Sequence, residues 1–147
     1  MDILILNGPN LKYIGQREPH IYGEKGLDAL PSLVAQEVSP RLNLTLKQSN
    51  SEGELINYLE EAWEKKVSGI VINAGAYTHT SIAIADCLSW IKIPYVEVHL
   101  SNVYAREEFR HKSYLSAKAL GVISGFGIYS YVLGVKALYH YLSQVES

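Results

Sequence analysis

The sequence has 147 residues, a length typical of one domain that buries about two thirds of its unfolded surface in a single core. Hydrophobic residues make up 48% of it and the formal net charge is -2. The chain therefore lacks the excess of basic residues that would indicate a nucleic-acid partner. Cys87 is the only cysteine, which excludes an intrachain disulfide and a cysteine-based metal site. Because there is neither a stretch of about twenty apolar residues nor a basic signal-peptide start, we expect a cytoplasmic protein with a single catalytic domain, residues 1–147.

Five short runs of aliphatic and β-branched residues alternate with segments of helical length. The first run, 2–7, is too uniformly apolar for a half-exposed strand and suits a strand that is buried on both faces of a parallel sheet. Similar runs follow at 42–47, 69–73, 95–98 and 121–124. The alternation predicts an α/β fold of flavodoxin-like type, with three layers and a five-stranded parallel sheet.

Four helices are predicted between and after these strands. The first begins near Asp28, because Pro31 is tolerated only in a first turn, and it ends before Pro40. Ser51 and Glu54 have the spacing of a capping box and begin the second helix, whose apolar side includes Trp63. The third helix is expected at about 80–91, with Cys87 as a small core residue, and the last at about 129–144.

Polar residues follow several of the predicted strands. In a parallel α/β sheet, ligands bind beyond the carboxyl ends of the strands. This rule brings the segments 7–10, 73–79 and 99–101 to one crevice. The connection from Gly8 to Gly23 is longer than the usual two to six residues of a βα loop, and we interpret it as a lid over that crevice. A loop that merely covers the end of the sheet is the alternative.

The stretch from Pro94 to Arg110 holds a candidate proton donor and a pair of arginines. Glu97 and His99 lie two apart in a strand, so they point to the same face at roughly 6.5 Å along the chain. A carboxylate in contact with an imidazole fixes its tautomer and stabilises the protonated ring, as a proton donor requires. Arg106 and Arg110 are four apart and are expected on one face of a short helical segment. An ordinary ion pair and a solvated charged face are the alternatives.

Elimination of other chemistries narrows the possible reaction. The 7–10 segment lacks the glycine spacing and the lysine of a nucleotide loop, and the chain has neither an aspartate cluster for a hard metal nor a Gly-x-Ser-x-Gly elbow. What remains is proton transfer, without a cofactor or a metal, on a small anionic, hydroxylated substrate. The candidate groups are Tyr22, Arg17, Asn10, Asn73, His79, His99, Glu97, Arg106 and Arg110.

The chain resembles the type II 3-dehydroquinate dehydratases over nearly its whole length, with seven segments in the order and spacing of that family. These segments are Ile5-Leu-Asn-Gly-Pro-Asn-Leu11, Arg17-Glu-Pro-His-Ile-Tyr-Gly23, Gln48-Ser-Asn-Ser-Glu-Gly53, Ile72-Asn-Ala-Gly-Ala-Tyr-Thr-His-Thr-Ser81, Val96-Glu-Val-His-Leu-Ser-Asn102, Arg106-Glu-Glu-Phe-Arg-His111 and Gly125-Phe-Gly127. The resemblance implies dehydration of 3-dehydroquinate to 3-dehydroshikimate by anti elimination through an enolate, with neither a Schiff base nor a metal.

The resemblance also implies catalytic roles for six residues. Tyr22 would remove the C2 proton, with its pKa lowered by Arg17 and Arg106. His99, oriented by Glu97, would protonate the departing C1 hydroxyl. Asn10 would help to hold the oxyanion or a water at C3. The implied substrate-binding residues are Asn73, Leu100 and Ser101 at the carboxylate, His79 and Arg110 at the hydroxyls, and Asp86.

Asp86 is implied to act across a subunit boundary. His79 and Asp86 lie seven apart, which is two helical turns, so we expect them to face the same way at roughly 10 Å along the helix axis, a distance that is awkward for one small substrate. In the family this aspartate reaches the site of a neighbouring subunit, in trimers that assemble into a dodecamer. A solvated helix residue is the alternative for Asp86.

Four positions depart from the pattern of the family, and none of them has an implied chemical role. They are Lys12 in place of the usual Asn, Ala74 in place of Pro, Ala85 in place of Arg and Ser130 in place of Gly. The competing hypothesis is a flavodoxin-like mononucleotide-binding or signalling domain. The missing phosphate loop and the missing acidic cluster argue against it.

Overall fold

Five parallel strands form one sheet at the centre of the molecule. The computed structural model describes residues 1–17 and 26–146. Its strands are β1 (Asp2–Asn7), β2 (Asn43–Gln48), β3 (Gly69–Asn73), β4 (Tyr95–His99) and β5 (Val122–Ser124). They lie in the order β2-β1-β3-β4-β5, and every neighbouring pair is parallel. This is the predicted flavodoxin-like arrangement, which is thereby confirmed.

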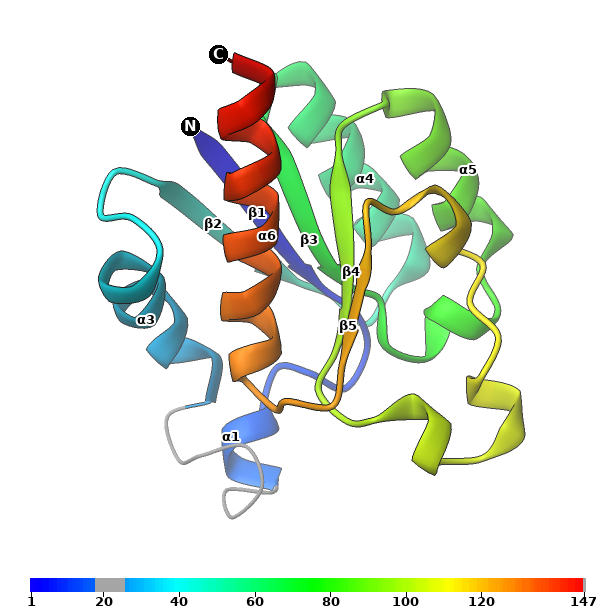
Figure 1. Ribbon diagram of the computed structural model, residues 1–147. Helices are drawn as coiled ribbons and strands as arrows, with labels where there is room; N and C mark the ends of the chain where they lie inside the picture. The colour runs from blue at the N-terminus through cyan, green and yellow to red at the C-terminus, as the bar shows by residue number, and fades with distance from the viewer. Residues whose placement is uncertain (18–25, 147) are drawn as a thin grey trace.

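Helices cover both faces of the sheet, which gives three layers (Figure 1). On one face, α3 (Leu30–Glu37) and α6 (Tyr129–Glu146) pack with Ile3 and Ile5 of β1. On the other, α4 (Glu52–Glu64) and α5 (Ile82–Ile91) pack with Leu4 and Leu6. Alternate residues of one strand thus enter two different cores, which is why the strand is apolar throughout.

Side-chain caps set where two of the helices begin. The Ser51 hydroxyl accepts the backbone N–H of Glu54, so α4 begins where the capping box predicted. The Ser81 hydroxyl accepts the N–H of Ile84 at 2.9 Å, so α5 begins at Ile82 rather than at residue 80. The preceding residues form a separate 3₁₀ turn, η2 (Gly75–His79).

Short 3₁₀ turns also replace two of the predicted helical segments. The first helix is preceded by η1 (Gly26–Ala29), so that α3 proper starts at Leu30. Arg106 and Arg110 do not share one helix face, because η3 (Val103–Ala105) and η4 (Glu108–Arg110) are separated by an extended Arg106. Two large apolar residues of the segment, Tyr104 and Phe109, remain exposed, so it lacks the buried apolar face that would stabilise a continuous amphipathic helix. A fifth 3₁₀ turn, η5 (Ser116–Lys118), leads toward β5, and a single helical turn, α1 (Ile14–Arg17), follows β1.

Both tryptophans of the chain lie on the outside of the second helix layer. Trp63 at the end of α4 contacts Trp90 at the end of α5 edge to face, with 5.2 Å between ring centroids. Trp63 remains 51% exposed, although the helical pattern had placed it on the apolar side of its helix. Cys87 on α5 is buried as predicted. Within the described residues, no helix has both the length and the hydrophobicity needed to cross a membrane.

The ends of β1 and β3 approach each other so closely that only glycine fits at residue 8. The Gly8 N–H donates to the carbonyl of Asn73 at 2.7 Å. A Cβ at position 8 would lie 2.3 Å from the carbonyl oxygen of Ala74, and backbone atoms cannot move aside as a side chain can. The two loops that follow these strands are therefore held side by side.

Replacing Gly8 with Ala should lower the free energy of unfolding by about 2 kcal/mol or more, because the added methyl group separates the β1 and β3 loops. Urea denaturation measures the effect. Gly121→Ala is the matched control, since a Cβ there meets no atom within 4 Å. Equal stability of the two variants would contradict the close approach.

Candidate active site

A cavity of about 480 Å³ opens at the carboxyl edge of the sheet. The strand register aligns the last residues of neighbouring strands there, with Asn7 beside both Gln48 and Asn73, and His99 beside Ser124. The structure brings nine of the predicted residues to the wall of this cavity: Asn10, Arg17, Asn73, His79, His99, Leu100, Ser101, Arg106 and Arg110. Glu97 lies directly behind His99.

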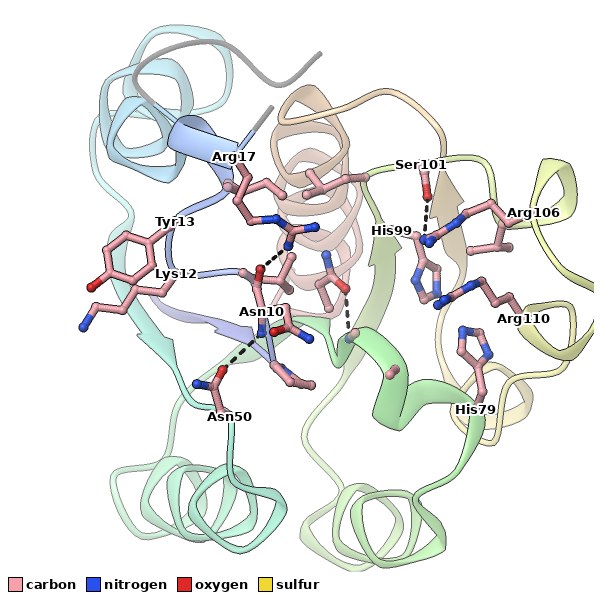
Figure 2. A pocket seen from close by; sticks show the side chains of 18 residues that line it. Asn10, Lys12, Tyr13, Arg17, Asn50, His79, His99, Ser101, Arg106 and Arg110 are labelled. Atoms are coloured by element: carbon pink, nitrogen blue, oxygen red, sulfur yellow. Dashed lines mark hydrogen bonds between the residues drawn. The ribbon is translucent and has the colours of Figure 1, made fainter. Parts of the chain in front are cut away.

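The cavity lies between two groups of side chains (Figure 2). Arg17, Asn10 and Asn50 approach it from the segments after β1 and β2. His99 faces them from the end of β4, and His79, Ser101, Arg106 and Arg110 face them from the segments after β3 and β4. The described lining includes four cationic residues, Lys12, Arg17, Arg106 and Arg110, and no aspartate or glutamate. In a protein with a formal net charge of -2, this concentration of positive charge favours an anionic ligand.

Hydrogen bonds fix the segment that follows β1. Arg17 Nη1 donates to the carbonyl of Asn10 at 2.7 Å. The N–H of Asn10 donates to Asn50 Oδ1 at 3.1 Å, and Gln48 Nε2 donates to the same oxygen and to the carbonyl of Gly8. Asn10 has a φ of 69°, a left-handed conformation that asparagine tolerates better than most residues. An asparagine at position 10 therefore tolerates the left-handed backbone and also places a short amide side chain at the cavity.

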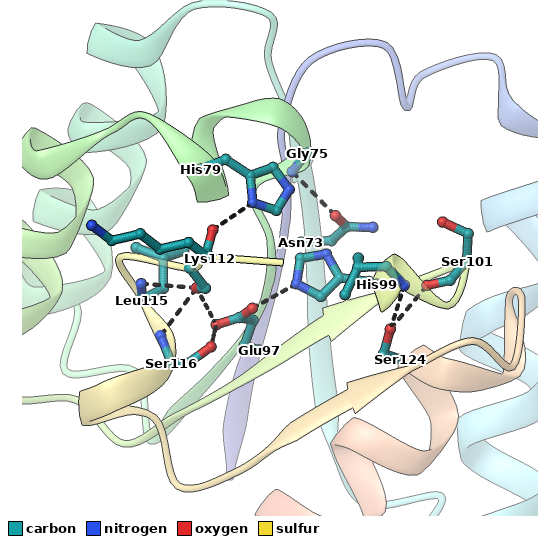
Figure 3. A network of polar contacts seen from close by, with 12 residues as sticks. Asn73, Gly75, His79, Glu97, His99, Ser101, Lys112, Leu115, Ser116 and Ser124 are labelled. Atoms are coloured by element: carbon teal, nitrogen blue, oxygen red, sulfur yellow. Dashed lines mark hydrogen bonds and ion pairs between the residues drawn. The ribbon is translucent and has the colours of Figure 1, made fainter. Parts of the chain in front are cut away.

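Glu97 and His99 form a buried pair (Figure 3). Glu97 is 1% exposed, and its Oε2 lies 2.5 Å from His99 Nε2. The other oxygen, Oε1, accepts the hydroxyl of Ser116 at 2.7 Å and that of Ser113 at 2.9 Å. Burial, the largest effect, by itself raises the pKa of Glu97, but the hydrogen bonds from His99, Ser116 and Ser113 and the charge of His99 outweigh it and hold the pKa below its ordinary value.

The two histidines of the cavity have defined ring orientations. His99 uses Nε2 for Glu97, so Nδ1 is the ring nitrogen that this carboxylate does not engage. His79 Nδ1 lies 2.7 Å from the carbonyl oxygen of Lys112, and because a carbonyl only accepts, Nδ1 carries the proton and donates it. The rings stack with 6.2 Å between centroids and 18° between planes. Each histidine therefore has one nitrogen held by the protein and one available to a ligand.

Arg106 and Arg110 reach the cavity from the two 3₁₀ turns. Arg106 Nη1 lies 3.5 Å from the hydroxyl oxygen of Ser101. Arg110 donates through Nε to Glu107 at 2.6 Å, and this bond, together with the charge of Arg110, lowers the pKa of the exposed Glu107 carboxyl. The bond orients the Arg110 guanidinium, whose Nη groups remain suited to hydroxyl or carboxylate oxygens.

Asn73 is held by a hydrogen-bonded group of three buried side chains. Its Nδ2 donates to the phenol oxygen of Tyr131 at 3.0 Å, and Tyr131 donates to Asn7 Oδ1. Asn73 Oδ1 accepts the N–H of Gly75 at 3.1 Å. Burial raises the pKa of Tyr131, although the bond from Asn73 opposes this, so the phenol stays neutral and donates. The group ties β1, β3 and α6 together beneath the cavity.

Two of the predicted site residues are not among those that the structure brings to the cavity. Asp86 is exposed on α5 and does not line the cavity of its own chain. Its predicted helical register with His79 was wrong, because the Ser81 cap separates η2 from α5. Residues 18–23 of the predicted lid, Tyr22 among them, lie outside the described residues.

Sequence reasoning assigned no role to several residues that shape the site. Asn50 follows the carboxyl end of β2, and the same strand-end rule that selected residues 7–10 would have found it. Ser113 and Ser116 lie far from Glu97 in sequence, and no local pattern links them. Tyr131 lies in the last helix, and no local pattern links it to Asn7 or Asn73. Among the described residues, no three His, Cys, Asp or Glu side chains gather in a way that could hold a metal ion.

Comparison with known proteins gives a consistent result. A family model described as Dehydroquinase class II matches residues 1–139. The chain is 53% identical over 148 residues to a 3-dehydroquinate dehydratase of Prochlorococcus marinus (strain NATL1A), covering 99% of this chain and 100% of the relative. A crystal structure of a type II dehydroquinase from Butyrivibrio crossotus has a TM-score of 0.85 at 42% identity, covering 94% of this chain and 97% of that one. That from Propionibacterium acnes has a TM-score of 0.81 at 40% identity, covering 97% and 96%.

Replacing Tyr131 with Phe should lower the free energy of unfolding by about 2 kcal/mol, because Asn7 and Asn73 each lose a partner while buried. Tyr129→Phe is the control on the same helix. Its hydroxyl bonds to Glu37 at the exposed surface, so its loss should cost about 0.5 kcal/mol or less. Urea denaturation of both variants measures the difference, and similar losses would argue against a special role for the buried group.

Proposed function

The chain belongs to the class II dehydroquinase family, whose activity makes it a hydro-lyase, and on this premise we propose that it converts 3-dehydroquinate to 3-dehydroshikimate by anti elimination through an enolate. The observation that carries the proposal is the buried Glu97–His99 pair at the wall of a cavity lined by three arginines. Such a cavity combines a proton donor with cations for the carboxylate of the substrate.

The first step is removal of the proton at C2. We assign this step to Tyr22, with the C2–H electrons moving into an enolate whose charge rests on the C3 oxygen. A tyrosine has an ordinary pKa of about 10, and a nearby cation lowers a pKa by about 1–3 units. Arg17 and Arg106 both line the cavity and are the cations assigned to this effect. Asn10 is assigned to the C3 oxygen, directly or through a water.

The second step is loss of the hydroxyl at C1. The enolate returns its electrons to form the C1–C2 double bond, the C1–O bond breaks, and His99 supplies the proton with which the hydroxyl leaves as water. The carboxylate of Glu97 supports this role because it accepts from Nε2 and stabilises the protonated ring. The Nδ1 nitrogen is then the atom that faces the substrate.

The remaining cavity residues bind the substrate in this proposal. Asn73 and the backbone amides of Leu100 and Ser101 receive the carboxylate. His79, through Nε2, and Arg110 receive ring hydroxyls. The fixed orientations of Asn73 and His79 support these assignments, since each is held from behind by a protein hydrogen bond. No cofactor and no metal takes part. The segment 8–23 acts as the lid of a single catalytic domain.

Asp86 is proposed to complete the cavity of a neighbouring subunit, in cytoplasmic trimers that assemble into a dodecamer. Ile82, Asp86 and Trp90 lie at intervals of four on α5, hence on one face, and all three are exposed. A carboxylate flanked by two exposed large apolar residues suits a contact between subunits. No observation favours the alternative of a mononucleotide-binding or signalling domain.

The activity is tested by adding 3-dehydroquinate to the purified protein and recording the ultraviolet absorbance of the enone product.

His99→Ala should lower kcat by at least about 100-fold, since general acid catalysis contributes that much. Tyr22→Phe should lower turnover and C2 proton exchange together. His140→Ala is the control, because His140 is exposed on α6 and outside the cavity. Absence of enone with the unaltered protein would overturn the function, and full activity of a variant would overturn the assigned role.

Replacing Asp86 with Ala should shift the sedimentation profile toward smaller species and lower kcat by at least about tenfold, because both the contact and the shared site lose a carboxylate. Glu60→Ala, at an exposed position of α4, is the matched control and should change neither property. A monomer that is fully active at the assay concentration would contradict a site shared between subunits.

A further inference from the structure

We propose that the segment Lys112–Ser116, called the 112–116 loop below, positions both histidines of the cavity. Ser113 and Ser116 hold Glu97, which holds His99, and the carbonyl of Lys112 holds His79. The inference rests on the proposed function for the meaning of the two histidines. It assigns positioning roles to residues outside the lining of the cavity. Figure 3 shows Lys112 at His79 and Ser116 at Glu97.

The first part of the argument concerns the buried carboxylate. Glu97 is 1% exposed, so each oxygen needs a donor from the protein. Oε2 is engaged by His99, and the two serine hydroxyls converge on Oε1 at 2.7 Å and 2.9 Å. Charge-assisted bonds of this length keep a buried carboxylate ionised and fixed. An ionised and fixed Glu97 is what orients the His99 ring.

The direction of the Ser113 bond is set by the loop itself. The Ser113 oxygen accepts the N–H of Leu115 at 3.0 Å and that of Ser116 at 3.1 Å. With its lone pairs directed at these two donors, the hydroxyl hydrogen points to Glu97. Ser113 therefore both shapes the loop and donates to the carboxylate. The Ser116 hydroxyl donates to the same carboxylate oxygen.

The loop is anchored on both sides of the site. The N–H of Tyr114 donates to the carbonyl of Thr78 in η2 at 3.0 Å. The phenol of Tyr95 on β4 donates to the carbonyl of Leu115 at 2.5 Å, and Leu115 itself is buried. These bonds attach the loop to the same two elements that carry the histidines. The ring stacking of His79 and His99 thus follows from one rigid segment behind them.

Several titratable groups surround Glu97 and belong in any account of its pH dependence. His99 lies on its own strand, and Tyr95 is on the same strand with a pKa raised to about 12 by burial and by the charge of Glu97. His79 of η2 stacks on His99, and Arg106 and Arg110 line the same cavity. The loop contributes two neutral hydroxyls. Removal of one hydroxyl leaves all of these charges in place.

Ser116→Ala is the direct test. With one donor gone, the ionised Glu97 is less stabilised, so its pKa rises and the protonated, non-orienting form appears at higher pH. We expect kcat at neutral pH to fall about tenfold with KM unchanged, because a carboxylate with one donor fewer orients His99 less firmly. The acidic limb of the pH–kcat profile should move to higher pH, because the pKa of Glu97 rises. A ¹³C NMR titration of the Glu97 carboxyl group should show directly, without any turnover, that its pKa is higher in the variant.

Three comparisons separate positioning from general stability. Ser116→Thr keeps a hydroxyl and should restore most of kcat. Ser89→Ala removes a half-buried hydroxyl that binds Lys118 outside the cavity, and it should leave the profile unmoved. In a Glu97→Gln background, Ser116→Ala should cost little more, because the two residues act through one another. If Ser116→Ala does not fold, Ser116→Cys provides the same comparison with a weaker donor.

The outcomes distinguish this inference from the proposed function. If the unaltered protein forms no enone, the function fails while the NMR titration still tests the link between Ser116 and Glu97. If the unaltered protein is active and Ser116→Ala moves neither the acidic limb nor the Glu97 titration, the positioning role is overturned. Equal effects of Ser116→Ala in the presence and absence of Glu97 would also overturn it.

Discussion

The contact between Glu97 and His99 imposes the strictest constraint on this molecule. A carboxylate that is 1% exposed is strongly destabilising unless donors surround it, and here the donors come from its own strand and from a loop more than a dozen residues away. That requirement fixes the path of the chain between β4 and β5. The same path supplies the carbonyl that holds His79. The chain thus meets one electrostatic need and orients two rings with one segment.

The parallel sheet supplies the rest of the arrangement. Because all five strands end at one edge, polar residues that are far apart in sequence become neighbours, as Asn7 and Asn73 show. Tyr131 of α6, in the helix layer on one face of the sheet, forms hydrogen bonds with both of these residues. The result is a cavity whose cations come from long side chains, while Asn73 and His99 are held by the buried partners Tyr131 and Glu97.

Local patterns were sufficient for the fold and for most of the cavity. The apolar run of β1, the Ser51 cap and the two-residue period of Glu97 and His99 are all local, and the structure confirms each of them. Contacts over long sequence separations were not predictable, which is why Ser113 and Ser116 were missed. Asn50 is different, because it follows the end of β2 and the strand-end rule could have found it. The short 3₁₀ turns around Arg106 were missed for a different reason. Their form depends on caps and on burial in the folded molecule rather than on periodicity.

The contact between Trp63 and Trp90 has a consequence for optical measurements. These are the only two indoles in the chain, and they lie in the last turns of α4 and α5. Because those helices run antiparallel to the strands, their last turns lie at the amino edge of the sheet, opposite the cavity. Intrinsic tryptophan fluorescence therefore reports the packing of this helix pair. Trp90 shares a face of α5 with Asp86, so it would also report the proposed contact between subunits. Occupancy of the cavity of the same chain calls for a different optical signal, such as that of Tyr13, which lines it.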